Sequence, residues 1–145
     1  MNRSTISLSF PDINVWLALA SPEHVHHAAA ARWWEKETGQ IGFSRLTQLG
    51  FLRLMTTSAA MDGKPLTLRN AWRVHDRLFD DERVVFVPEP AGVESDFRQG
   101  SSGQIVAPKL WSDVWLIAFA KCAGGVMITF DAALAARAED AVLLN

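Results

Sequence analysis

The stretch FPDINVWLAL, residues 10–19, places a single carboxylate, Asp12, between two apolar segments. Residues 6–10 (ISLSF) alternate apolar and polar side chains, which predicts a short strand, and the apolar run 13–20 predicts a helix. Pro11 separates the two segments, so Asp12 falls at a strand-to-helix junction. Because a buried carboxylate is costly unless its charge is offset, this position calls for a chemical reason.

The rest of the chain alternates predicted helices and strands. Predicted helices cover residues 24–37, 46–55, 68–79, 89–99 and 113–122 and a short segment after Asp131; predicted strands cover residues 41–43, 84–87, 126–129 and 142–144. The uninterrupted apolar run Val84–Val87 is typical of a strand buried on both faces. The alternation predicts a mainly parallel sheet between two layers of helices, an α/β/α fold, in a single domain spanning residues 1–145.

Composition narrows the function classes. The chain has 145 residues, 49% of them hydrophobic, and a net charge of −2, which argues against a protein that coats nucleic acid through a strongly basic surface. Its one cysteine, Cys122, cannot form an internal disulfide, so we expect a reducing cytoplasm. The longest apolar run, Val114–Ala120, is far below the roughly 18 residues of a membrane span, and we expect no membrane association.

Three aspartates carry the strongest chemical signal. Asp12 and Asp131 follow predicted strands, and Asp113 begins the most apolar predicted helix. Ligands of parallel sheets bind beyond the carboxyl ends of the strands. A divalent cation such as magnesium would offset three carboxylates gathered there, and a water on that metal could attack a phosphodiester. Taken singly, each aspartate could equally be a helix-starting residue.

Three other groups of residues carry weaker signals. The histidines of segment 24–27 could hold a transition metal, but a solvated helix face is favoured because no H-E-x-x-H motif accompanies them. An arginine stripe at i, i+4, i+8 spacing could meet RNA phosphate or pair with neighbouring aspartates. The stripe is Arg69, Arg73 and Arg77, the aspartates are Asp76, Asp80 and Asp81, and the tryptophans that could stack on bases or fill a core are Trp33, Trp34 and Trp72.

Four segments together resemble the PIN-domain ribonucleases, in particular the VapC-type toxins of bacterial toxin–antitoxin pairs. They are FPDINVWLAL (10–19), TQLGFLR (47–53), WSDVWLIAFA (111–120) and ITFD (128–131), in the order of the family and over nearly the whole chain. The resemblance implies a five-stranded sheet of order 3-2-1-4-5 and RNA cleavage that depends on Mg²⁺, with Mn²⁺ as a substitute. It also implies a small antitoxin partner and a homodimer.

The resemblance assigns roles to individual residues. Asp12, Asp113 and Asp131 match the family's acidic positions and are expected to be the catalytic residues and metal ligands. Asn14 matches a small polar residue two positions after the first aspartate, and it is expected, with Arg53, to position the substrate. Gln48 stands where many members carry a glutamate, and it is expected as a fourth catalytic residue because its carbonyl can still coordinate a metal or position a water. An amide adds no negative charge and is a poor general base, so Gln48 favours one metal ion over two.

These expectations leave two alternatives. A catalytically weakened PIN-like module would bind RNA or an antitoxin without cleaving. A phosphohydrolase of the haloacid dehalogenase type would need a second aspartate at position 14, where this sequence has Asn14. The sequence therefore favours a metal-dependent toxin ribonuclease.

Overall fold

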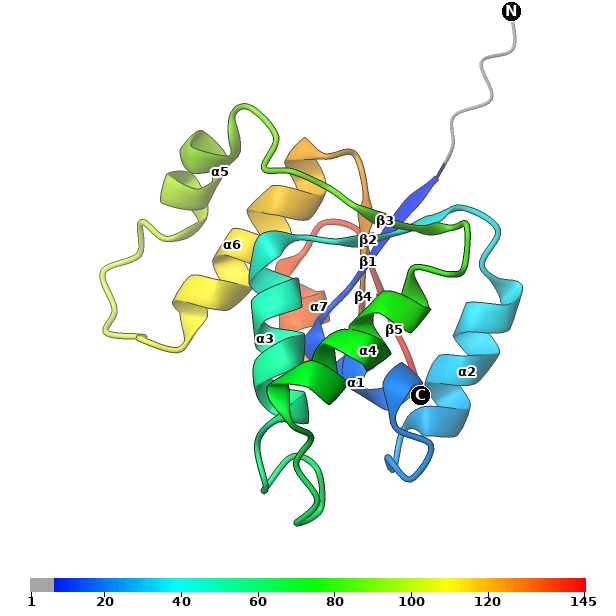
Figure 1. Ribbon diagram of the computed structural model, residues 1–145. Helices are drawn as coiled ribbons and strands as arrows, with labels where there is room; N and C mark the ends of the chain where they lie inside the picture. Colours follow the sequence, from blue (N-terminus) through cyan, green and yellow to red (C-terminus); the bar gives the residue numbers. More distant parts are fainter. Residues whose placement is uncertain (1–6) are drawn as a thin grey trace, which may run out of the picture.

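Five parallel strands form the centre of the molecule in the order β3-β2-β1-β4-β5 (Figure 1). The structure, a computed structural model, describes residues 7–145. The strands are β1 (Leu8–Pro11), β2 (Gln40–Phe43), β3 (Val84–Phe86), β4 (Val126–Thr129) and β5 (Ala141–Leu143). The predicted strand order and parallel direction are confirmed. The predicted start of the first strand, Ile6, lies outside the described residues.

Helices cover both faces of the sheet. They are α1 (Ile13–Ala20), α2 (His27–Lys36), α3 (Arg45–Met55), α4 (Leu68–Leu78), α5 (Val93–Gly100), α6 (Leu110–Cys122) and α7 (Ala132–Arg137). Parallel strands are joined by right-handed crossovers, so helices that connect strands in one direction along the sheet share a face. Accordingly α1 to α4 pack together, and α5 to α7 lie on the side of β4 and β5. This arrangement confirms the three-layer α/β/α fold.

Each face of the sheet has its own apolar core. On the face of α1 to α4, the Trp16 ring stacks on Phe43 of β2, with 3.8 Å between ring centroids. On the opposite face, Phe10 of β1 meets Phe119 of α6 edge to face, with centroids 5.1 Å apart. Phe10 directly precedes Pro11 and Asp12, so this second core holds the end of β1 in place.

Two glycines make room for the Phe10 ring. A Cβ atom added to Gly42 of β2 would lie 2.7 Å from the ring, and one added to Gly125, just before β4, would lie 2.6 Å from it. Contacts this short are repulsive, so only glycine fits at these two positions. The large ring between two glycines seats β1 closely between its neighbours and brings the ends of β1 and β4 together.

The prediction that strand 84–87 is buried on both faces is wrong. In β3 only Val84 is buried, and Phe86 is 36% exposed. The physical reason is the strand order, which makes β3 an edge strand with a neighbour on one side only. The Arg45 guanidinium lies 4.6 Å from the centroid of the Phe86 ring and covers part of it.

Three predicted helix starts are also wrong. α5 begins at Val93 and not at residue 89, because Gly92 before it has a left-handed backbone with a φ of 86°. α2 begins at His27 and not at residue 24, because His24 accepts a turn hydrogen bond from the His27 N–H (2.9 Å). The three histidines therefore share no helix face. α6 begins at Leu110, three residues before the predicted start, after a turn in which the Leu110 N–H donates to Ala107 (3.0 Å). Ser112 consequently lies inside the helix.

The charged stripe on α4 does not form the predicted pairs. Within residues 7–145 no ion pair joins these arginines to the neighbouring aspartates: Asp76 contacts His75, and Asp81 contacts Arg83. Trp33 and Trp34 pack against the α1 to α4 core, as expected. None of the helices between residues 7 and 145 has the length and apolar character needed to cross a membrane.

Arg83, just before β3, fixes the end of α2 to the sheet. Its guanidinium donates to the main-chain carbonyls of Trp34 (2.6 Å) and Glu37 (2.5 Å) and to the Asp81 carboxylate (2.7 Å). It also lies 4.7 Å from the centroid of the Trp34 ring. Trp34 lies in the last turn of α2 and Glu37 is its C-cap, and carbonyls at a helix end lack partners inside the helix. The Arg83 hydrogen bonds lower the pKa of Asp81 below its usual 3.8.

We expect Arg83→Met to lower the free energy of unfolding by about 2 kcal/mol, because it removes charged hydrogen bonds to partly buried carbonyls. The folded-state pKa of Asp81 is depressed, so the contribution of the pair is present above pH 3.8 and is lost as the pH falls below it. Urea unfolding at pH 7 and at pH 3 measures both effects.

The matched control is Arg77→Met on the exposed side of α4, which should change the free energy of unfolding by less than about 0.5 kcal/mol. Equal effects of the two substitutions at pH 7 would contradict this role of Arg83.

Candidate active site

Asp12 lies at the carboxyl end of β1, between β1 and α1. Its side chain is only 6% exposed. Oδ1 accepts a hydrogen bond from the Val15 N–H (3.0 Å), so Asp12 is the N-cap of α1, and Oδ2 accepts one from the Thr129 hydroxyl. Burial raises the pKa of Asp12, the hydrogen bonds lower it, and the charge of Asp131 raises it further. Asp12 is therefore a buried carboxylate that is only partly compensated.

Thr129 connects the two strand ends. It is the last residue of β4 and is fully buried. Its hydroxyl donates to Asp12 and accepts from the Asp131 N–H (2.9 Å). Asp131 in turn is the N-cap of α7, where Oδ1 accepts from the N–H groups of Ala133 (2.9 Å) and Leu134 (3.2 Å). The hydroxyl thus ties the ends of β1 and β4 together at the point where the strand order reverses.

Asp113 reaches this region from α6. It lies in the first turn of the helix, where the helix dipole favours a negative charge. Partial burial raises its pKa, the charge of Asp131 raises it further, and the charge of Arg137 lowers it. Asp131 acts electrostatically on both Asp12 and Asp113, so it lies close enough to each of them for its charge to raise their pKa values.

The carboxylates do not form a closed metal cage. Among residues 7–145, no three His, Cys, Asp or Glu side chains converge closely enough to hold an ion by themselves. Magnesium usually keeps several waters and takes one or two carboxylates directly, so an open set of oxygen donors suits it. Repulsion by Asp131, which raises the pKa of the other two carboxyls, is what a bound cation would reverse. The donor chemistry therefore fits a hydrated divalent cation.

Gln48 is buried at the start of α3 but turns toward α4. Its Oε1 accepts from Arg45, and its Nε2 lies 3.2 Å from Nε2 of His75. His75 donates through Nδ1 to Asp76 (2.9 Å), so its Nε2 is free to accept from the Gln48 amide. Both ends of the amide have partners within α3 and α4. No described hydrogen bond joins Gln48 to the aspartates.

The two predicted positioning residues lie on exposed helix surfaces. Asn14 is in the first turn of α1, two residues after Asp12, and its N–H also lowers the pKa of that carboxyl. Arg53 is in the last turn of α3. Asn14 is therefore beside the aspartates along the chain, whereas no described contact links Arg53 to them.

Sequence reasoning missed Thr129 and Arg137. Thr129 lies within the ITFD motif, two residues before Asp131, and a hydroxyl at the end of a buried strand was the available signal. Arg137 ends the helix that Asp131 begins, and only the packing of α7 near α6 reveals its effect on Asp113.

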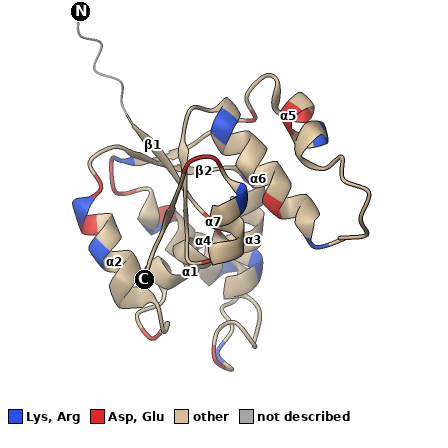
Figure 2. Ribbon diagram, turned by 180° about the vertical axis from the view of Figure 1, so that it is seen from behind, with Lys and Arg blue, Asp and Glu red and all other residues tan. Residues whose placement is uncertain are grey.

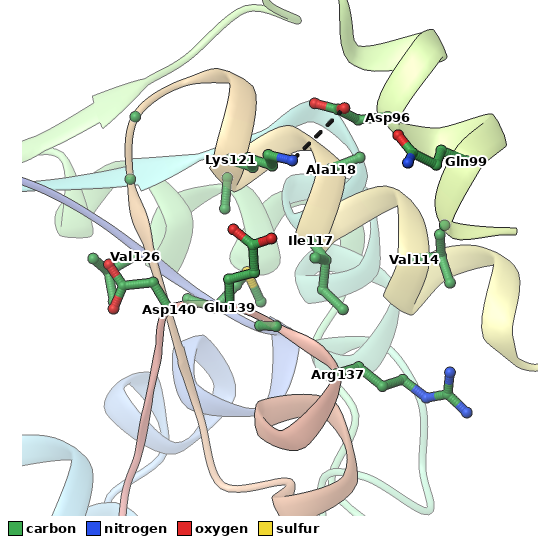
Figure 3. Close-up of a pocket in the computed structure, with 16 residues that line it drawn as sticks. Asp96, Gln99, Val114, Ile117, Ala118, Lys121, Val126, Arg137, Glu139 and Asp140 are labelled. Carbon is green, nitrogen blue, oxygen red and sulfur yellow. Dashed lines mark ion pairs between the residues drawn. The ribbon is translucent and has the colours of Figure 1, made fainter.

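A cavity of about 700 Å³ lies between α5, α6 and the connection from α7 to β5 (Figure 3). It contains charges of both signs, among them Lys121, Arg137 and Asp140, and none of the three aspartates of the candidate site lines it. Figure 2 likewise shows ribbon segments of basic residues (blue) and of acidic residues (red) intermixed over that side of the molecule. A polyanion such as RNA would therefore be attracted to individual basic side chains on this side of the molecule and not to one continuous basic surface.

Comparisons with known proteins agree with this geometry. The PIN domain family model matches residues 9–140. Ribonuclease VapC41 of Mycobacterium tuberculosis is 41% identical over 128 residues, covering 84% of this chain and 88% of the relative. Ribonuclease VapC39 of the same species is 33% identical over 133 residues, covering 86% and 88%.

Solved structures share the fold at lower identity. Mycobacterium tuberculosis VapC20, described as a sarcin-ricin loop cleaving toxin, superposes with a TM-score of 0.67 at 16% identity, covering 88% of this chain and 93% of VapC20. FitAcB of Neisseria gonorrhoeae superposes with a TM-score of 0.60 at 19% identity, covering 93% and 96%. The family match over most of the chain and the two VapC relatives lead to one conclusion: this chain belongs to the PIN-domain family, among its VapC-type toxin ribonucleases.

Proposed function

We propose that this chain hydrolyses RNA phosphodiester bonds at the junction of β1, β4 and α6, using Asp12, Asp113 and Asp131 with a bound Mg²⁺ or Mn²⁺. The observation that carries the proposal is the electrostatic coupling of three carboxylates from distant parts of the chain at the strand-order reversal. Ligands of such sheets bind at this point. The membership of the chain in the VapC-type ribonucleases supports the choice of RNA.

The residues divide the work by their surroundings. The bound metal would lower the pKa of a water and offset charge on the phosphate. Asp12 is held in one orientation by the Val15 N–H and the Thr129 hydroxyl, so a ligand finds it already in place. Asp131 keeps Oδ1 on the start of α7, and its Oδ2, which takes no part in these hydrogen bonds, would be the ligand atom.

Gln48 supports a site with one metal ion. Its amide is bound by Arg45 and His75, and no described hydrogen bond joins it to the aspartates. The side chain also carries no charge with which to offset a second ion. We assign Asn14 to substrate positioning beside Asp12, and Arg53 to a phosphate contact farther along α3.

We also propose a cytoplasmic toxin that is restrained by a small antitoxin and forms a homodimer. Exposed apolar side chains on α3 and α4, namely Leu49, Leu68 and Trp72, support a protein contact on that face. Size-exclusion chromatography of the chain alone, and with the product of a neighbouring short reading frame, tests both associations.

We expect Asp12→Asn to abolish Mg²⁺-dependent cleavage of a synthetic RNA pool, by at least about 100-fold, because it removes an anionic ligand. Asparagine is also a good N-cap, so α1 should stay intact. The raised pKa of Asp12 means that its ionised form costs stability in the folded protein at neutral pH. The melting temperature of the variant at pH 7 should therefore equal or exceed that of the wild type, with the difference shrinking as the pH falls toward 3.8.

Asp62→Asn, in the turn after α3, is the matched control and should leave cleavage unchanged, since asparagine tolerates the positive φ of 53° there. Chelation of the metal should stop cleavage by wild type and control alike. Undiminished cleavage by folded Asp12→Asn would refute the assignment of Asp12. Absence of metal-dependent cleavage by the wild type would favour the non-cleaving module.

We expect Thr129→Val to shift the acidic limb of the pH profile of cleavage to higher pH. The Thr129 hydroxyl lowers the pKa of Asp12, so its removal lets burial raise that pKa further and protonates Asp12 at a higher pH. Initial cleavage rates measured across the pH range report the shift. Thr129→Ser keeps the hydroxyl, so the acidic limb of its pH profile should match that of the wild type. If the acidic limb lies at the same pH in Thr129→Val and Thr129→Ser, the hydroxyl does not set the pKa of Asp12.

We expect Gln48→Ala to lower the free energy of unfolding by about 1–3 kcal/mol, because His75 Nε2 loses its buried partner. Cleavage at saturating Mg²⁺ should stay within a few-fold of wild type. Urea unfolding and initial rates separate the two effects, and a loss of cleavage by folded Gln48→Ala as large as that of Asp12→Asn would make Gln48 part of the catalytic site.

A further inference from the structure

A second cavity, of about 460 Å³, opens at the start of α6 beneath the loop that follows α5. Its walls are mostly apolar, and the residues that matter below are Val106, Leu110, Trp111, Val114 and Arg137. Val106 is 99% exposed and Trp111 is 57% exposed. Phe97 of α5 meets the Trp111 ring edge to face, with centroids 5.9 Å apart, so the indole is supported from the side of α5.

The cavity adjoins the carboxylate site. Leu110, three residues before Asp113 and its neighbour on the surface of α6, lines the cavity, and Val114 of the same helix lines it too. Arg137 lines the same cavity and also acts on the charge of Asp113. In Figure 3 its guanidinium points away from Glu139 and Asp140, and within residues 7–145 it forms no ion pair.

The composition of the cavity suits a nucleotide of single-stranded RNA. A base needs an aromatic or apolar surface on which to stack, and its phosphate needs a cation nearby. Trp111 of α6 supplies the first and Arg137 of α7 the second, and Arg137 is also the residue whose charge acts on Asp113. The volume is that of a pocket for a small ligand. A flat contact with a second protein copy would call for a broader surface.

We propose that Trp111 and the apolar cavity bind an unpaired RNA base next to the cleaved phosphate, with Arg137 contacting the backbone. The proposal rests on the ribonuclease function proposed above and adds to it the way in which the substrate is selected. Bases that are splayed out of a helix would enter the cavity, whereas paired bases would not. RNA loops and unpaired ends are therefore the preferred substrates.

The test uses an RNA oligonucleotide that contains a site cut by the wild-type protein in a randomised pool. In a series of derivatives, each nucleotide around the cut is replaced in turn by an abasic one. For wild type, we expect one abasic position to reduce kcat/KM on the order of tenfold, the size typical of a lost stacking contact. Trp111→Ala should show a similar reduction on the intact oligonucleotide and no further reduction at that abasic position. Trp111→Phe, which retains an aromatic ring, should recover most of the activity.

Val106→Glu is a second test variant. The Val106 side chain is fully exposed, so the substitution should leave the fold intact. A negative charge at the cavity should weaken binding of the same RNA to the Asp12→Asn protein, as measured by fluorescence anisotropy. Ala59→Glu, which adds the same charge at an exposed residue in the turn after α3, is the matched control and should leave RNA binding by the Asp12→Asn protein unchanged.

The outcomes separate the two proposals. If wild type neither cleaves nor binds the RNA pool, the ribonuclease function fails and the base pocket with it. If wild type cleaves but Trp111→Ala equals it in kcat/KM and Val106→Glu does not weaken RNA binding, only the base pocket is overturned. The same holds if the kcat/KM of Trp111→Ala falls below that of wild type by the same factor at every abasic position. A Trp111→Ala protein that changes oligomeric state and keeps wild-type kinetics assigns the cavity to a second copy and also overturns the base pocket.

Discussion

A negative charge at the end of β1 is the constraint around which the rest of this fold is arranged. Asp12 is buried between a strand and a helix, and the Val15 N–H and the Thr129 hydroxyl compensate its charge only in part. Burial and Asp131 keep its pKa raised, so the folded chain holds a carboxylate that gains from a cation. A buried charge that lowers the stability of the folded chain is typical of a functional site.

The two cores hold that charge in place. Phe10 sits between Gly42 and Gly125 and packs on Phe119, which sets β1 tightly beside β2 and β4. At the end of β4 the Thr129 hydroxyl then hydrogen-bonds to Asp12, and Asp131 two residues later is the N-cap of α7. The same packing that stabilises the sheet therefore fixes the distance between the carboxylates, and a change in the core would reach the site through the strand ends.

Residues around α6 combine two kinds of chemistry. Asp113 feels the charge of Asp131, while Leu110 and Val114 of the same helix line an apolar cavity. Because α6 begins at Leu110 and not at residue 113, both belong to the first turns of one rigid helix. Hydrolysis and base recognition would thus be held at a constant separation by a single element, with Arg137 between them.

Local pattern determined much of this protein. The alternation of apolar segments predicted the layers, and the helix Ile13–Ala20, the strand Val126–Thr129 and the positions of Asp12 and Asp131 at strand ends followed from residues next to one another in the chain. What only the tertiary structure decided depends on partners distant in sequence. Val84–Phe86 is an edge strand because of strand order, Gln48 turns to His75, and Thr129 bonds Asp12 across 117 residues. Hydrogen bonds and burial of this kind arise between separate elements, so no local spacing of residues encodes them.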